Sequence, residues 1–234
     1  MHMRMTTRQI ERMIVYEDEE LLVVHKPPFL AVETKNIRQQ DLVSLLTNRR
    51  AANGERGGIY VIHRLDQPVE GLLVLAKTRE AAAALGRELT GSGFSKEYYA
   101  VVWGITESSG TLVHTLQRDG RTNTSAVVVG AAADGAKEAR LSYERLAVKD
   151  EKSLLRIALD TGRHHQIRVQ LAAAGHPLVG DVKYGGQQPS GDGQPLALCS
   201  SRLCFTHPKS GEPMEFCAVP TGGGFAEFAS ELHS

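Results

Sequence analysis

The stretch IYVIHRLDQPVEGLLVLA, residues 59–76, sets a charged segment between two apolar runs. Residues 59–62 and 71–76 carry mostly aliphatic and aromatic side chains, which is typical of buried strands. The segment between them must be a loop, because Pro68 has no N–H for a central strand and disfavours helix at Gln67. Loops fixed by rigid strands commonly hold catalytic groups. The stretch therefore predicts two strands that present a polar loop containing Asp66.

Further strands and helices are indicated on both sides of this stretch. Strand-like runs lie at residues 14–16, 21–24, 96–103, 125–129, 139–146 and 154–158. Helical patterns lie at residues 79–89, 165–174 and 41–49, the last with Asp41 as a candidate N-cap. Strands outnumber helices without alternating regularly with them, so we expect an α+β fold whose mostly antiparallel central sheet is flanked by helices and loops.

One domain is the simplest organisation for a chain of 234 residues. We expect residues 1–13 to form a flexible tail and residues 14–234 to form a single domain. A loop rich in Gly, Ser and Pro is expected at residues 187–194, and a frayed end at residues 225–234.

The overall composition is that of a globular protein and does not itself indicate a nucleic-acid partner. The 27 basic residues equal the 27 acidic ones, so any RNA site must be a local patch. No apolar run approaches the roughly 20 residues that cross a bilayer, and the first residues lack the apolar core of a secretion signal. We therefore expect a cytoplasmic protein without a membrane partner.

Three cysteines, Cys199, Cys204 and Cys217, form neither an even disulfide framework nor a paired metal-binding motif. We interpret them as free thiols and expect no metal. A zinc site that combines them with His207 is the less favoured alternative, because the spacing matches no known ligand pattern.

Asp66 is the strongest candidate for chemistry in the loop. For an isolated Asp-x-Pro the usual interpretation is a carboxylate that caps a turn. The surrounding sequence must therefore decide whether Asp66 has a catalytic role. Glu70 follows four positions later, but Pro68 prevents the helix that would align two carboxylates for glycoside hydrolysis. One carboxylate without an acid partner fits a reaction in which no water is added. The chain also lacks a Gly-rich nucleotide loop and a serine nucleophile elbow.

A second polar segment, TGRHHQIRVQL, places Arg163, His164, His165 and Arg168 at the start of a predicted helix. An arginine directed at Asp66 would hold that carboxylate in the ionised form that a nucleophile requires. The alternative is a surface helix with ordinary basic residues. Adjacent histidines on a helix point in different directions, so a shared metal is not expected.

Five blocks resemble, in order, the RluA-type RNA pseudouridine synthases. They are VVHKPPFLAVET, HRLDQPVEGLLVLAKT, KEYYAVVWG, TGRHHQIRVQLAAAGHPLVGDVKYG and LCSSRLCFTHPKSGEPMEF. The resemblance implies the pseudouridine synthase catalytic fold and an isomerase that needs no cofactor. It also implies that a uridine is flipped out of a structured RNA stem-loop, with ribosomal RNA favoured over transfer RNA.

The resemblance assigns roles to individual residues. Asp66 matches the aspartate on which catalysis depends, either by attack at C1′ or through a glycal. Tyr98 matches the tyrosine that packs against the base, and Arg168 matches the arginine that pairs with the aspartate. Arg64 matches a position that helps to hold the base out of the helix. Further candidate RNA contacts are His63, Arg163 and His165.

Some features depart from many members of that family. Val69-Glu70 replaces Thr-Ser beside Asp66, and Gln170 replaces His. The chain reaches the opening block so early that we expect no S4-type RNA-binding domain before it. We also expect the protein to be a monomer. Two other functions stay open: a catalytically silent RNA-binding assembly factor, and a hydrolase that releases free uracil.

Overall fold

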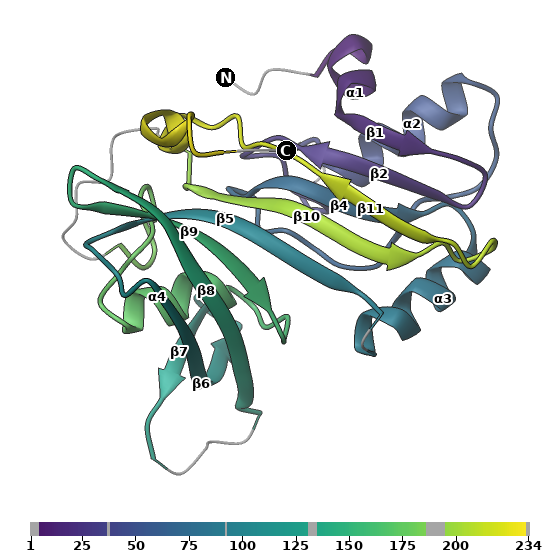
Figure 1. Ribbon diagram of the computed structural model, residues 1–234. Coiled ribbons are helices and arrows are strands. Elements are labelled where there is room, and N and C mark those ends of the chain that lie inside the picture. Colours follow the sequence, from purple (N-terminus) through teal and green to yellow (C-terminus); the bar gives the residue numbers. More distant parts are fainter. Residues whose placement is uncertain (1–4, 37, 92, 131–134, 186–194, 233–234) are drawn as a thin grey trace. The chain divides into compact units, whose positions relative to one another are not determined.

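The computed structural model describes residues 5–36, 38–91, 93–130, 135–185 and 195–232. The chain divides into two compact units, whose helices and strands are labelled in Figure 1, and the single-domain organisation stays a prediction. The first unit comprises Met1–Lys96 and Ser200–Ala218, and the second comprises Glu97–Cys199 and Val219–Ser234. Both units are α+β with antiparallel strand pairing, which confirms the predicted fold class.

The first unit combines a sheet with helices. Its strands are β1 (Ile14–Glu17), β2 (Leu21–Lys26), β3 (Tyr60–Val61), β4 (Glu70–Ala76), β10 (Leu198–Thr206) and β11 (Pro213–Cys217). Four of them lie in the order β1-β2-β4-β10, while β11 pairs with β10 and β3 pairs with β4. Its helices are α1 (Thr7–Met13), α2 (Leu42–Ala52) and α3 (Arg79–Thr90).

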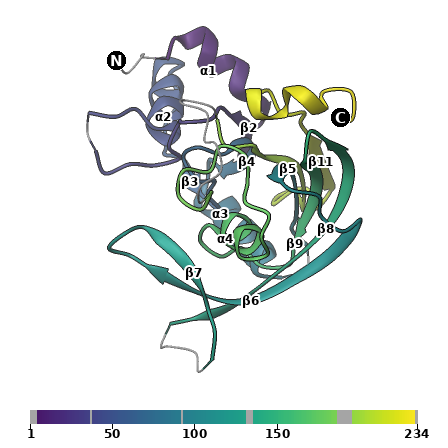
Figure 2. The same cartoon turned by 90° about the vertical axis from the view of Figure 1, so that its left-hand side faces the viewer.

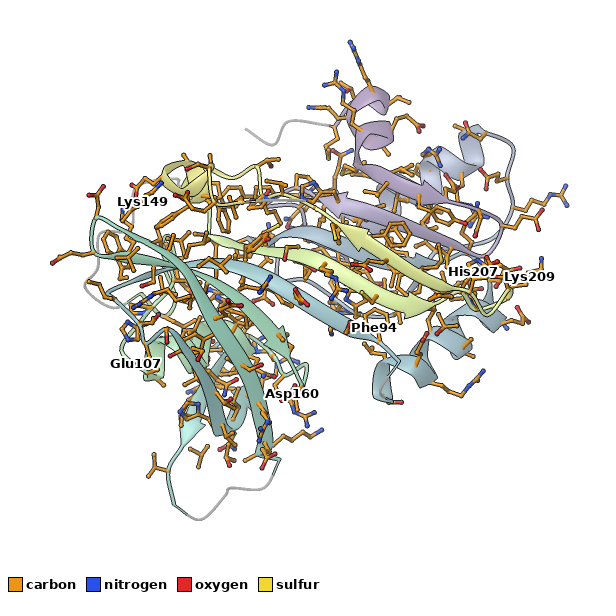
Figure 3. All side chains as sticks on the ribbon, viewed as in Figure 1. Phe94, Glu107, Lys149, Asp160, His207 and Lys209 are labelled. Atoms are coloured by element: carbon orange, nitrogen blue, oxygen red, sulfur yellow. The ribbon has the colours of Figure 1, made fainter. Side chains whose placement is uncertain are left out.

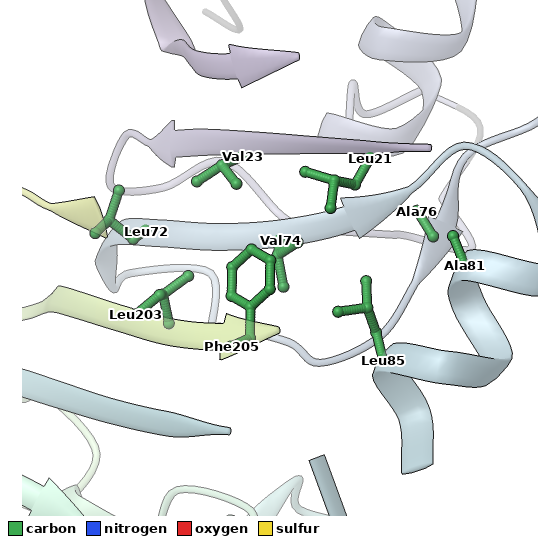
Figure 4. Close-up of a cluster of buried hydrophobic side chains, with 9 residues drawn as sticks. All are labelled: Leu21, Val23, Leu72, Val74, Ala76, Ala81, Leu85, Leu203 and Phe205. Carbon is green, nitrogen blue, oxygen red and sulfur yellow. The ribbon is translucent and has the colours of Figure 1, made fainter. Parts of the chain in front are cut away.

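One face of this sheet forms a hydrophobic core with α3 (Figure 4). The antiparallel register sets Leu21 opposite Ala76 and Val23 opposite Val74. Because side chains alternate along a strand, these residues point to the same face. Leu85 of α3 is fully buried against them. The apolar run that predicted β4 from sequence therefore supplies Leu72, Val74 and Ala76 to this core.

The helix ends follow local capping chemistry. The Asp41 carboxylate accepts the N–H of Ser44 at 2.7 Å, which confirms the predicted N-cap of α2. Thr6 and Gln9 form a capping box at the start of α1. Residues 7–13, expected within a flexible tail, are thus a capped helix whose Ile10 and Met13 are buried.

The turn between β10 and β11 is joined to the turn between β1 and β2. His207 Nε2 lies 2.8 Å from an Asp18 carboxylate oxygen, and Lys209 Nζ lies 3.4 Å from Glu19 (Figure 3). The other Asp18 oxygen accepts the N–H of Glu20 at 2.7 Å. Residues from both ends of the sequence therefore close one end of this sheet.

A close backbone approach requires glycine at the second position of β4. Gly71 has a φ of +117°, and a Cβ atom there would lie 2.3 Å from the carbonyl oxygen of Ser200 in β10. A side chain at this position would overlap with backbone that cannot move aside without disrupting the sheet. Gly71 thus allows the backbones of β4 and β10 to approach closely at the start of β4.

The second unit contains β5 (Ser95–Trp103), β6 (Ser109–Asp119), β7 (Thr124–Val128), β8 (Lys137–Lys149) and β9 (Lys152–Leu159). The strands lie in the order β5-β9-β8-β6-β7, each antiparallel to its neighbour. Helix α4 (Gln166–Ala173) contacts the β6–β7 hairpin (Figure 2). None of the helices in the described ranges is long and apolar enough to cross a membrane.

The C-terminal segment differs from its predicted frayed state. A 3-10 helix, η1 (Gly223–Phe228), places Phe225 and Phe228 in a core with Val101 and Leu154. Leu232 is 7% exposed and belongs to the same core. The expected loop at residues 187–194 lies outside the described residues.

Candidate active site

The Asp66 loop connects β3 to β4 and is fixed by apolar residues on both sides of the carboxylate. Leu65 and Val69 are buried, whereas Asp66 is half-buried. The N–H of Val69 donates to the Asp66 carbonyl at 3.0 Å, which closes a turn. The loop predicted from Pro68 is therefore confirmed, and two hydrophobic anchors hold it.

Lys26, the last residue of β2, is fully buried behind this loop. Its Nζ donates to the carbonyls of Pro27, Leu30 and Gln67 at 3.0, 2.8 and 3.2 Å. Burial lowers the pKa of Lys26 to about 7, while the carboxylates of Asp66 and Glu70 act in the opposite direction. A lysine with three carbonyl partners thus joins the segment after β2 to the residue that follows Asp66.

His63 and Arg64, both expected to contact RNA, lie in very different surroundings. The His63 ring is buried, accepts the N–H of Val74 at Nε2 and packs edge-on against Phe94, with centroids 5.3 Å apart. Arg64 is exposed and forms an ion pair with Glu33. Direct RNA contact by either side chain stays a prediction, and Arg64 is the more accessible of the two.

The buried His63 predicts a pH-dependent stability. Burial, reinforced by Lys96, lowers the pKa of His63 from 6.5 to about 3. Between these values the unfolded chain binds a proton that the folded chain does not bind, so the free energy of unfolding should fall as the pH falls through this range. We expect His63→Gln, which keeps an acceptor for Val74, to show a smaller loss of stability on acidification.

Urea unfolding near neutral pH and at about pH 5 measures this difference. The half-buried His114 and His176 would be poor control positions because both form hydrogen bonds. The comparison is therefore with the wild type across pH. Equal acid-induced losses in the wild type and in His63→Gln would contradict the assignment.

In the second unit, Arg168 is held by a buried carboxylate. Its Nε and Nη2 donate to the two oxygens of Asp181, each at 2.8 Å, and both side chains are at most 4% exposed. Burial raises the pKa of Asp181, but hydrogen bonds from Arg168 and from the N–H groups of Lys183 and Tyr184 outweigh burial and hold it below its usual value. The guanidinium also lies over the Tyr184 ring, 5.1 Å from its centroid. Arg168 is therefore fixed in orientation before any substrate binds.

Tyr184 connects this arginine to the histidines at the start of α4. Its hydroxyl lies 2.7 Å from His165 Nδ1 and accepts the N–H of Ser125 at 2.8 Å. His165 has a φ of +54° and stacks on His164 with centroids 3.7 Å apart. Ser125 Oγ in turn lies 2.9 Å from His164 Nδ1. This network anchors β7 to the N-terminus of α4, so His165 has a clear structural role.

Tyr98 and Arg163 complete the set of predicted residues. Tyr98 lies in β5, is 6% exposed and faces Ile157 across the β5–β9 pair. Arg163 is exposed, and its Nε donates to the Glu138 carbonyl at 2.9 Å. Contact between Arg163 and RNA stays a prediction.

The predicted residues are distributed over the two units. Asp66 lies in the first unit, whereas Tyr98 and Arg168 lie in the second, and their proximity to Asp66 stays a prediction. Sequence reasoning assigned no role to three further residues: Lys26, Asp181 and Tyr184. All three lie in the blocks that carry the family resemblance. For Lys26 the sequence contained a signal, because a lysine ends the otherwise apolar strand LLVVHK. In the part of the chain that the structure describes, no three His, Cys, Asp or Glu side chains are grouped as metal ligands.

Comparison with known proteins defines the class. Residues 20–173 match the family model described as RNA pseudouridylate synthase. The chain belongs to this family, as the resemblance of its sequence blocks predicted.

Individual relatives carry names from the same family. The chain is 40% identical over 183 residues to ribosomal large subunit pseudouridine synthase D of Pseudomonas aeruginosa, covering 77% of this chain and 55% of that protein. It is 35% identical over 234 residues to the protein of the same name from Pasteurella multocida, covering 94% of this chain and 70% of that protein. The chain spans 55% to 66% of the length of several of these curated relatives.

Solved structures agree with this family. Human RNA pseudouridylate synthase domain containing 1 superposes with a TM-score of 0.74 at 28% identity, covering 88% of this chain and 82% of that chain. Human RNA pseudouridylate synthase domain containing 4 superposes with a TM-score of 0.73 at 22% identity, covering 92% of this chain and 91% of that chain, and supports the fold.

Proposed function

We propose that this protein isomerises specific uridines in structured RNA to pseudouridine, with Asp66 as the nucleophile. The observation that carries the proposal is the family match over residues 20–173, which includes the complete Asp66 loop. Ribosomal RNA is the favoured substrate, because relatives at 34% to 40% identity are named for the large ribosomal subunit. Transfer RNA is the second choice.

The reaction breaks the bond between ribose C1′ and uracil N1, turns the base and joins C5 to C1′. Nothing is oxidised and no group is transferred between molecules, so the reaction itself demands no redox cofactor or metal. The protein must supply a nucleophile, hold the detached base and exclude water from the sugar. Asp66 serves as the nucleophile, either at C1′ or by an elimination that gives a glycal.

Arg168 and Tyr98 provide the supporting chemistry in this proposal. Arg168, held rigidly by Asp181, pairs with the Asp66 carboxylate and keeps it charged. Tyr98 offers a flat face for uracil and a hydroxyl for the proton that finally leaves C5. The target uridine must flip out of its stem-loop, at a cost of a few kcal/mol, which phosphate contacts by exposed residues such as Arg64 offset.

Tritium release tests the proposal directly. RNA labelled with 5-tritiated uridine loses its label to water when C5 joins C1′, so the purified protein should release tritium from ribosomal RNA. Mapping of pseudouridine in total RNA, from cells with and without the gene, should then reveal sites that depend on this protein. RNA binding without tritium release would instead favour the assembly factor, and release of free uracil would favour a hydrolase.

A further inference from the structure

Phe29 is an exposed aromatic side chain in the loop that joins β2 to α2, and the proposed mechanism does not use it. It begins an apolar run in which Leu30, Ala31 and Val32 are all buried, whereas Phe29 is 53% exposed. A single exposed apolar side chain is ordinary in a folded protein. The backbone conformation of Phe29 and its neighbours must therefore decide whether it has a role.

The backbone of Phe29 adopts a conformation that is rare for a bulky residue. Its φ is +66°, in the left-handed region where the Cβ atom crowds the backbone. The other described non-glycine residues with a positive φ all have polar side chains: Asn123, Asp150, Glu151 and His165. Strain of this kind persists only where the surrounding structure imposes it, and it is concentrated at functional sites.

Hydrogen bonds impose this conformation and join it to the Asp66 loop. The Phe29 carbonyl accepts a bond from Gln67 Nε2 at 3.0 Å, and the next carbonyl, of Leu30, accepts one from Lys26 Nζ at 2.8 Å. The same Nζ donates to the Gln67 carbonyl at 3.2 Å. Because Gln67 follows Asp66 directly, these bonds fix the aromatic side chain relative to the loop of the proposed nucleophile.

Exposed cations accompany Phe29. Its loop, residues 27–40, contains Lys35 and Arg38 as basic residues and Glu33 as its one acidic residue. Lys35 and Arg38 are exposed, and so is Arg64, which forms an ion pair with Glu33. Aromatic faces that stack on bases, with cations that contact phosphates, are the combination by which proteins bind unpaired nucleotides. The composition of this surface therefore favours RNA over an apolar protein partner.

We propose that Phe29 is a substrate-binding residue that stacks on an unpaired RNA base beside the target uridine. The inference rests on the proposed function, because that base belongs to the RNA on which Asp66 acts. When the uridine flips out, the adjacent bases lose a stacking partner, and the flat ring of Phe29 replaces it. The strained backbone keeps this ring in solvent, where a base can reach it.

The test compares Phe29→Gly with Phe29→Trp by filter binding to a transcript of large-subunit ribosomal RNA. Phe29→Gly removes the ring, so RNA affinity should fall and KM should rise, each by about tenfold. Glycine adopts a positive φ without strain, so the free energy of unfolding in urea should be unchanged or higher. Phe29→Trp keeps an aromatic face and should bind within about threefold of the wild type. At saturating RNA, kcat for tritium release should stay close to wild type in both variants.

Two matched controls should keep the wild-type RNA affinity. Asp150→Gly changes another residue with a positive φ, +46°, on the β8–β9 turn, and Val15→Ala removes most of another exposed apolar side chain, on β1. Unchanged RNA affinity in Phe29→Gly would overturn the inference, and loss of self-association in that case would assign Phe29 to a protein interface. Weaker binding in both Phe29 variants, with a lower free energy of unfolding, would mark a role in folding and also overturn it.

Fluorescence provides a readout of stacking without catalysis. Trp103 is the one tryptophan of the chain, so Phe29→Trp combined with Trp103→Phe leaves a single indole, in the loop. Its emission should fall when the RNA transcript is added, because stacking on a base quenches indole fluorescence. Unchanged emission at saturating RNA would contradict the inference alone. A wild-type protein that neither binds the transcript nor releases tritium would contradict the proposed function instead.

Discussion

Asp66→Asn is expected to reduce tritium release from uridine-labelled RNA by roughly a thousandfold or more, because the amide cannot act as the nucleophile. Asn has nearly the shape of Asp, and the loop should keep its position because Leu65 and Val69 remain buried. RNA affinity should therefore persist while turnover is lost. Single-turnover tritium release and a filter-binding assay, performed on the same preparation, measure the two quantities.

A matched substitution controls for the loss of one carboxylate. Asp160→Asn removes an exposed carboxylate of the second unit, whose partner Arg140 is also exposed (Figure 3). This variant should keep wild-type turnover. Wild-type tritium release by Asp66→Asn would eliminate the assigned nucleophile.

Arg168→Met is expected to lose most turnover and also to lower the free energy of unfolding. The turnover effect follows from the proposed pairing of Arg168 with Asp66. The stability effect follows from Asp181, which would be left buried without its cationic partner at a cost of about 3–5 kcal/mol. Tritium release and urea unfolding at one pH measure the two effects.

A double variant separates the two causes. In Arg168→Met with Asp181→Asn the buried charge is gone, while the Asn oxygen still accepts the N–H groups of Lys183 and Tyr184. We expect this protein to regain most of the lost stability and none of the lost turnover. Restored turnover in the double variant, or normal turnover in Arg168→Met, would show that the arginine acts only in folding.

The fold was predictable where a short segment contains its own signal. Asp41 and the leucines that follow it predicted α2 and its N-cap, and the apolar run after Pro68 predicted β4. Strand β10 escaped prediction because Ser200 and Ser201 interrupt its apolar pattern, although both are buried. The prediction of a frayed C-terminal segment was wrong for a related reason. Phe225 and Phe228 pack against residues that lie far away in the chain.

The site was predictable to a lesser degree. The loop pattern and the family blocks selected Asp66, but the roles of Lys26 and Asp181 depend on tertiary neighbours. Sequence reasoning expected a carboxylate beside Arg168, and the structure places Asp181 there. That carboxylate is 13 positions away in the chain and outside any helical spacing, so only the fold could identify it.

The first unit is built from two segments that lie far apart in the chain, and this affects how it folds during translation. Residues 200–218 supply β10, β11 and two core residues, Leu203 and Phe205, to a sheet that otherwise uses residues 1–96. A nascent chain that has just emerged with β1 to β4 therefore lacks one neighbour of β4 until about a hundred further residues have been translated. During that interval the apolar surface around Leu72 and Val74 is open to unwanted association, so an early stop in translation should yield an insoluble fragment.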